Sequence, residues 1–249
     1  FEFRMLGSSQ SIASPNVVLN TIMAQELEEF ADVLEQSNDF QADLQNLLHD
    51  TFKAHQRIIF NGNGYGEDWV QEAQRRGLSN LRDTVDCMPA YIDPKNIRLF
   101  AGHNILSETE MRARYEIHLE NYCKVTAIEA STLRDMVLRG ILPAVNRYTA
   151  DLTQAILHKR ELVVPCRVEE DLLQKLSALT GSLYDTMAAI NEAMDKAPDA
   201  EGGIDAARYY REEIVRRMEE ARQSIDQLES LTAAKYWPYP TYADILFSV

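Results

Sequence analysis

The sequence is poor in the residues that end helices and make turns. It holds ten glycines and eight prolines among 249 residues, where average usage would give about 17 and about 12. Few turn residues mean few turns and long elements, which favours helices. Apolar side chains make up 45% of the chain and charged ones 26%. We therefore expect a folded, mainly α-helical chain of one or two domains.

Positive charge is also scarce. The chain has 25 Lys and Arg against 39 Asp and Glu, a net charge of −14. Nucleic-acid backbones and anionic membrane surfaces would repel such a protein. No apolar run reaches the roughly 18 residues needed to span a bilayer. The sequence therefore predicts neither a nucleic-acid partner nor a membrane partner.

Cysteine is rare, and the usual catalytic and metal-binding signatures are missing. The three cysteines are far apart and form no CxxC pair, a pattern typical of free thiols in a reducing cytoplasm. The five histidines show no i, i+4 pair and no HExxH. No GxSxG elbow is present either. The sequence therefore nominates neither a His or Cys metal site nor a Ser or Cys nucleophile.

Helical periodicity covers much of what is there. Ser14 as N-cap and Pro15 in the first turn predict a helix to about residue 36. A second helix follows at about 40–57. Between residues 78 and 106 we expect short helices and loops.

The second half of the chain indicates longer helices. Ser107 and Glu110 form a capping box before a run that continues to about residue 162, kinked by Gly140 and Pro143. Further apolar residues then recur at close to heptad spacing; they are Leu172, Leu176, Leu179, Leu183, Met187, Ile190 and Met194. With another run at about 204–235, this predicts an antiparallel helical hairpin packed on the long helix. The aromatic, proline-containing tail at 236–249 cannot be one regular helix and should lie against another surface.

One glycine-rich segment interrupts the helices. Residues 61–66 read NGNGYG, and Asn-Gly pairs tolerate positive φ, so a tight turn belongs here. A phosphate-binding loop is the alternative. The segment lacks the Lys-Ser/Thr that such loops carry. In addition, Glu67 and Asp68 stand at the helix start, where their negative charges would oppose a bound phosphate.

The N-terminal residues suggest a strand with a possible site. Residues 1–5 alternate, so that Glu2 and Arg4 share one face of a short β-strand. The pair can be a plain surface ion pair. Alternatively, the Glu2 carboxylate is a hard oxygen ligand for Mg²⁺, and the Arg4 guanidinium can hold a phosphate or carboxylate in bidentate fashion. The second interpretation describes one wall of a phosphoryl-transfer site.

Four blocks along the chain resemble the glutamine synthetases, and their sequences resemble those of type III in particular. The blocks are FEFRMLGSSQSIASPNVVLNT at 1–21, IIFNGNGYGEDWVQEAQRRGL at 58–78, RYEIHLENYCKVTAIEA at 114–130 and WPYPTYADILF at 237–247. In that family an Arg-x-Glu-x-Arg strand, a loop and a helix close the catalytic domain. The resemblance implies an enzyme that ligates ammonia to glutamate with ATP, through an acyl phosphate, with Mg²⁺ or Mn²⁺. It implies that Glu2 is a metal ligand and that Arg4 is catalytic, contacting the transferring phosphoryl group and the substrate carboxylate.

The resemblance also sets the expected organisation. The first Arg of the motif would precede Phe1, and the family's other metal ligands, nucleotide pocket and ammonia site lie upstream of it. We therefore expect a C-terminal fragment, inactive alone, in which residues 1–60 end the catalytic domain and residues 61–249 form the helical type III C-terminal domain. The family implies a dodecamer of two hexameric rings. The alternative interpretation is a helical structural or oligomerisation module with no catalytic role of its own.

Overall fold

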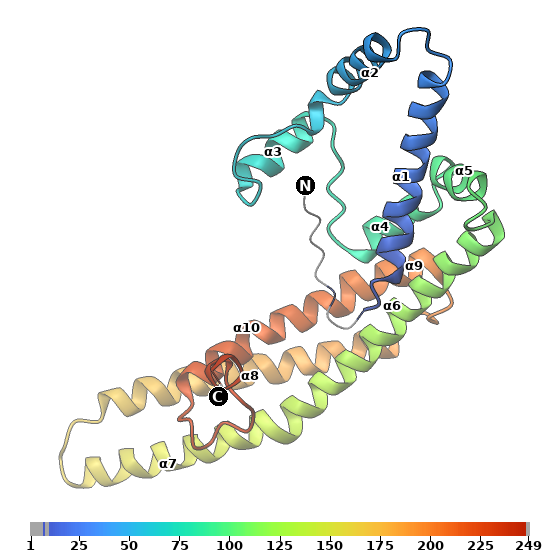
Figure 1. Ribbon diagram of the computed structural model, residues 1–249. Coiled ribbons are helices and arrows are strands. Elements are labelled where there is room, and N and C mark those ends of the chain that lie inside the picture. The colour runs from blue at the N-terminus through green and yellow to red at the C-terminus, as the bar shows by residue number, and fades with distance from the viewer. Residues whose placement is uncertain (1–6, 8–9, 248–249) are drawn as a thin grey trace. The chain divides into compact units, whose positions relative to one another are not determined.

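A computed structural model describes residue 7 and residues 10–247, without the side chains of Tyr242 and Ala243. The chain divides into two compact units, one reaching Tyr115 and the other beginning at Glu116 (Figure 1). Within the described residues every regular element is a helix, so the mainly α-helical prediction is confirmed. The strand predicted at residues 1–5 lies outside the described residues.

The described residues of the first unit form five α-helices and a 3₁₀ turn. Its elements are α1 (Ala13–Leu34), α2 (Phe40–Ala54), the 3₁₀ turn Gln56–Ile58, α3 (Glu67–Arg75), α4 (Thr84–Tyr91) and α5 (Pro94–Gly102). The short helices predicted between 78 and 106 are therefore present as α4 and α5.

The N-cap predicted for the first helix is wrong. Ser14 lies inside α1, which begins at Ala13, and the Ser11 hydroxyl accepts the Ala13 N–H at 3.2 Å. Pro15 is then the third helical residue, where a missing N–H costs no intrahelical hydrogen bond. The helix can thus start earlier than the proline alone suggests.

Helices α1 and α2 leave much of their apolar surface uncovered. They pack against each other, and α1 also packs against α5. Yet Leu27 and Phe52 remain 61% and 62% exposed, and Met23, Phe40 and Leu48 are exposed as well. We call these five residues the α1–α2 apolar surface. An exposed apolar patch of this kind is typical of a surface that another protein segment covers.

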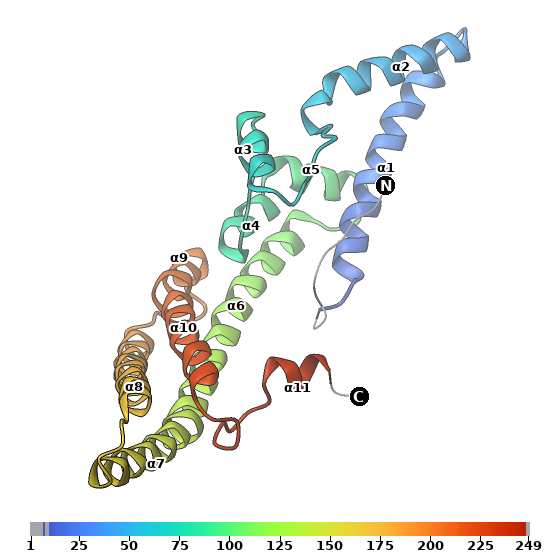
Figure 2. The ribbon, with the colours of Figure 1, turned by 90° about the vertical axis from the view of Figure 1, so that its left-hand side faces the viewer.

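The second unit is a bundle of long helices. Its elements are α6 (Glu108–Met136), which begins in the first unit, a π-helical segment Val137–Ile141, α7 (Leu142–Glu161), α8 (Arg167–Asp195), α9 (Gly203–Tyr209), a second π-helical segment Tyr210–Val215, α10 (Arg216–Leu231) and α11 (Tyr242–Leu246). Helix α8 turns back along α7 and also packs on α10. Figure 2 shows the tail that leaves α10 and ends in α11.

Two local predictions for the long helix are confirmed. The Ser107 N–H and hydroxyl both donate to one Glu110 carboxylate oxygen at 2.8 Å, which completes the capping box and lowers the pKa of that carboxyl. At the predicted kink the helix widens to π geometry, where the Leu142 N–H donates to the Val137 carbonyl five residues back. Pro143 explains the change, because it has no N–H and its ring would clash with the carbonyl four residues earlier.

The heptad-spaced residues of α8 form a core seam. Leu176, Leu183, Met187 and Ile190 are all at most 1% exposed, and α8 packs on α7 and α10. The predicted antiparallel hairpin on the long helix is therefore present. The second π-helical segment, Tyr210–Val215, has no proline or glycine, so no sequence signal announces it.

Candidate functional site

The structure does not describe the two predicted site residues. Glu2 and Arg4 both lie outside the described residues. Among the residues that are described, no three or more His, Cys, Asp and Glu side chains are grouped so that they could hold a metal ion. The described part of the chain instead holds two other arrangements of side chains, one around residues 57–76 and one at the C-terminal tail.

The glycine-rich segment is the tight turn that the sequence predicts. The Tyr65 N–H donates to the Asn63 side-chain oxygen at 3.1 Å, and the Gly66 N–H donates to the Asn63 carbonyl at 3.3 Å. Helix α3 then begins at Glu67 and ends before Gly77, which has φ +71. Tyr65 is left 89% exposed at the tip.

The prediction that the glycines of this turn adopt positive φ is wrong. None of the glycines at 62, 64 and 66 has a positive φ. Gly62 is instead required for space, because a Cβ there would come within 2.8 Å of a ring carbon of Phe60. The Phe60 ring in turn stacks on Trp69 of α3, with ring centroids 4.2 Å apart and planes at 26°.

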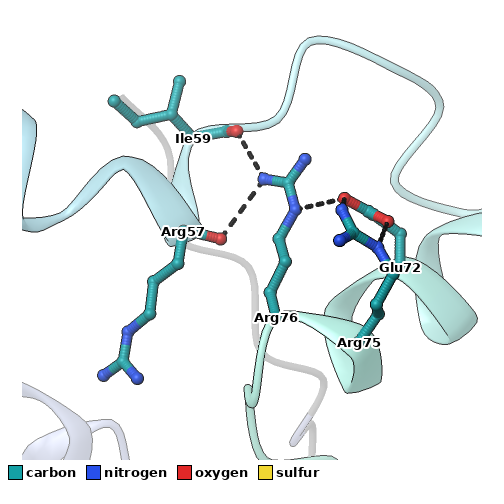
Figure 3. A network of polar contacts seen from close by, with 5 residues as sticks. All are labelled: Arg57, Ile59, Glu72, Arg75 and Arg76. Carbon is teal, nitrogen blue, oxygen red and sulfur yellow. Dashed lines mark hydrogen bonds and ion pairs between the residues drawn. The ribbon is translucent and has the colours of Figure 1, made fainter.

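Arg76 fastens the chain before the turn to the end of α3. Its Nη1 donates to the carbonyl oxygens of Ile59 at 2.8 Å and Arg57 at 3.3 Å, and its Nε donates to Glu72 at 2.5 Å (Figure 3). Its guanidinium also lies 5.8 Å and 5.7 Å from the ring centroids of Phe60 and Trp69, within the range of cation–π attraction. We call Arg76, Glu72, Phe60 and Trp69 the Arg76 clamp. The clamp thereby holds residues 57–60, just before the 61–66 turn, against α3.

The ionisation of Glu72 gives the clamp a pH dependence. Hydrogen bonds from Arg75, at 2.7 Å, and then from Arg76 lower the pKa of Glu72 from 4.5 to about 2. A carboxyl whose folded-state pKa is lowered stabilises the fold above its ordinary pKa and loses that effect as the pH falls towards the folded-state value. The clamp should therefore hold at pH 4.5 and weaken between pH 4.5 and 2.

Trp69 fluorescence can test this in a chain carrying Trp237→Phe. We expect a steady signal from pH 7 to 4.5 and a change below that. Glu72→Gln should give the low-pH signal already at pH 7, whereas the control Glu67→Gln, at the start of α3, should keep the unsubstituted profile. A transition centred near pH 4.5 would contradict the ion-pair account.

The C-terminal tail lies on its own bundle, as predicted for a segment in need of a surface. The Tyr236 hydroxyl donates to the Asp151 carboxylate, and its ring lies 5.3 Å from that of Tyr148 on α7. Further along, the Tyr239 hydroxyl donates to the Met136 carbonyl at 3.2 Å, at the end of α6. Both contacts lie on α6 and α7, so the tail spans the π-helical segment.

Gly140 makes room for that second contact. A Cβ at this position would come within 3.0 Å of the Tyr239 ring carbon that bears the hydroxyl. Gly140 thus does more than permit the kink. It admits an aromatic side chain from residues about a hundred positions away.

A double-mutant cycle tests this packing. Gly→Ala inside a helix ordinarily raises stability by up to about 1 kcal/mol, so Gly140→Ala should do this in a Tyr239→Ala chain. In the unsubstituted chain the clash outweighs the gain, and we expect a loss of about 1 kcal/mol. Urea unfolding followed by circular dichroism measures both values. An equal effect in the two backgrounds would show that Tyr239 does not occupy the space beside Gly140.

A cavity of about 330 Å³ remains beneath the tail. Leu133, Met136, Ile141 and Ile225 line it from the helices, and Trp237, Tyr239, Pro240 and Ile245 line it from the tail. Arg222, Asp226 and Glu229 of α10 complete the lining. The cavity lies wholly within the second unit.

Sequence reasoning missed both arrangements. Arg76 binds the backbone carbonyls of Ile59 and Arg57, which precede it by 17 and 19 positions. Backbone carbonyls leave no trace in a pattern of side chains. Gly140 and the tail aromatics are conspicuous singly, but nothing in the sequence pairs them.

The described residues also include no helix both long enough and apolar enough to cross a bilayer.

Comparison with known proteins gives a consistent family. The family model for the glutamine synthetase C-terminal domain matches residues 43–160. A glutamine synthetase of Butyrivibrio fibrisolvens is 36% identical over 208 residues, covering 83% of this chain and 30% of that protein. A type-3 glutamine synthetase of Dictyostelium discoideum is 33% identical over 261 residues, covering 99% and 35%, respectively.

A third relative shows the same coverage. A glutamine synthetase of Bacteroides fragilis is 29% identical over 258 residues, covering 100% of this chain and 35% of that protein. The chain thus spans about a third of the length of the curated relatives it matches. The matched region contains the clamp, the capping box, the first π-helical segment and α7 as far as residue 160. We conclude that this chain belongs to the glutamine synthetase family and carries its C-terminal domain.

Proposed function

We propose that this chain is the C-terminal part of an enzyme that ligates ammonia to glutamate with ATP. The observation that carries the proposal is the 36% identity to a glutamine synthetase over 83% of the chain. In this reaction a phosphoryl group is transferred to the γ-carboxylate, because a free carboxylate is too poor an electrophile for ammonia. Ammonia then displaces phosphate from the acyl phosphate.

The residues that we propose for this chemistry are the two on the expected N-terminal strand. Glu2 would be a ligand of Mg²⁺ or Mn²⁺, and Arg4 would hold the transferring phosphoryl group and the substrate carboxylate. A bound divalent metal would neutralise the phosphoryl charge during transfer. Neither residue is described in the structure, so both assignments rest on the motif FEFR at 1–4.

The proposed domain division places residues 1–60 at the end of the catalytic domain and residues 61–249 in the type III C-terminal domain. The α1–α2 apolar surface supports the first part, because exposed Leu27 and Phe52 need a covering partner. We also propose a cytoplasmic protein, which the exposed free thiol of Cys87 supports.

The second candidate function is a structural or oligomerisation module, within the dodecamer of two rings that the family implies. Uncovered apolar side chains where α7 is connected to α8 favour it: Leu162 and Val163 of the connection and Val168 at the start of α8 are 75%, 91% and 75% exposed. The heptad-spaced residues of α8 and the tail do not favour it, because both are engaged within the chain.

One preparation of the isolated chain tests both functions. We expect no ATP-dependent γ-glutamyl hydroxamate, because the chain carries a single proposed metal ligand. Turnover by the isolated chain would refute that view. Light scattering of the same sample should give a mass above the 28.4 kDa of one chain if the chain is also an assembly module, and a monomer would exclude an autonomous module.

A further inference from the structure

We propose that the cavity beneath the C-terminal tail binds a small organic cation, an ammonium group carried on an apolar or aromatic body. The proposal goes beyond the ligase function, since it concerns residues of the second unit only. It rests on three observations: the tail that forms part of the cavity wall is anchored, the walls are mainly apolar and aromatic, and the charged residues at the edge carry one net negative charge.

The tail is anchored at two positions, one just before the cavity wall that it provides and one within that wall. Tyr236 is held at Asp151 and Tyr148, and Tyr239 is held at the Met136 carbonyl. Trp237 lies between these anchors and lines the cavity. Both anchors lie on α6 and α7, so they hold Trp237 and Tyr239 in the cavity wall. About 330 Å³ lies within the range of small-molecule sites in proteins.

The walls suit an apolar body. Leu133, Ile141 and Ile225 come from the helices, and Trp237 and Tyr239 add two aromatic rings. Burial of apolar surface would favour any such ligand. Aromatic walls also attract cations through the negative faces of their rings.

The charged edge selects the sign of the ligand. Arg222, Asp226 and Glu229 stand at i, i+4 and i+7 on α10 and all line the cavity. Arg222 Nε is bound to Asp226 at 2.6 Å, so this pair is neutral. Among the described residues Glu229 has no ion pair of its own, which leaves one net negative charge. The chain's net charge of −14 further opposes an anionic ligand.

The apolar and aromatic walls and the net negative edge of the cavity together decide which compounds should be used to test binding. We would titrate the whole chain with 2-phenylethylammonium, with uncharged 2-phenylethanol and with anionic 3-phenylpropanoate by isothermal calorimetry. These three share one ring and differ in charge. We expect saturable one-to-one binding of the ammonium compound, at least about tenfold weaker binding of the alcohol and no binding of the carboxylate.

Two variants locate the binding. Glu229→Gln should weaken binding of the ammonium compound by about tenfold and leave binding of the alcohol unchanged. The matched control Glu219→Gln, an exposed position on the same helix, should bind the ammonium compound like the unsubstituted chain. Both variants keep the helix, which circular dichroism checks.

The proposal is overturned if the ammonium compound shows no saturable binding, if all three probes bind alike, or if the two variants behave alike. Because the isolated chain is the sample, none of these outcomes depends on ligase activity.

Discussion

Replacing Glu2 by alanine in the full-length enzyme is expected to lower metal-dependent glutamine formation by about 100-fold or more. The proposed reaction gathers negative charge from a nucleotide phosphate and a carboxylate at one place, and a metal ion offsets that charge only while its ligands hold it. Loss of one carboxylate ligand would weaken metal binding and would also displace the metal from its position in the site. The measurement is the rate of γ-glutamyl hydroxamate formation as a function of Mg²⁺ or Mn²⁺ concentration.

The metal titration separates this role from a structural one. If Glu2 is a ligand, Glu2→Ala should need more metal for half-maximal rate, and saturating metal should restore part of the activity. Glu219→Ala on α10 is the control and should retain normal activity and metal dependence. A Glu2→Ala enzyme within threefold of normal, at unchanged metal dependence, would remove Glu2 from the site and leave only the plain surface pair with Arg4.

Local rules predicted the elements well where one cause dominates. Ser107 and Glu110 cap α6 as expected because both partners of the box are three residues apart. The start of α1 was missed because Pro15 fits any of the first helical positions, so the proline alone does not decide which residue is the N-cap.

Contacts between distant residues account for what sequence could not supply. The Gly140 and Tyr239 contact, and the Arg76 bonds to the carbonyls of residues 57 and 59, depend on how elements meet in space. Glu2 and Arg4, by contrast, were assigned from the motif FEFR alone, and both lie outside the described residues. The charged edge of the tail cavity combines residues of one helix with a wall from the tail, which no local pattern joins.

Leu183→Ala in the middle of α8 is expected to lower the free energy of unfolding of the second unit by about 3 kcal/mol. Leu183 is 0% exposed on the helix that packs against both α7 and α10. Truncation of a fully buried leucine costs about 2–5 kcal/mol, part of it for the cavity left behind. The control is Leu157→Ala on α7, whose side chain is 53% exposed and should cost less than about 1 kcal/mol.

Urea unfolding, followed through Trp237 in a Trp69→Phe chain, measures this cost in the second unit alone. The decisive feature is its dependence on protein concentration. A seam buried within one chain gives the same midpoint at every concentration, because no partner is lost on dilution. A seam buried between copies gives a midpoint that falls on dilution, since association then contributes to stability. Complete burial of Leu183 within the single chain requires the first behaviour, and a midpoint that moves with dilution would mean that the heptad residues of α8 serve assembly rather than the core of this domain.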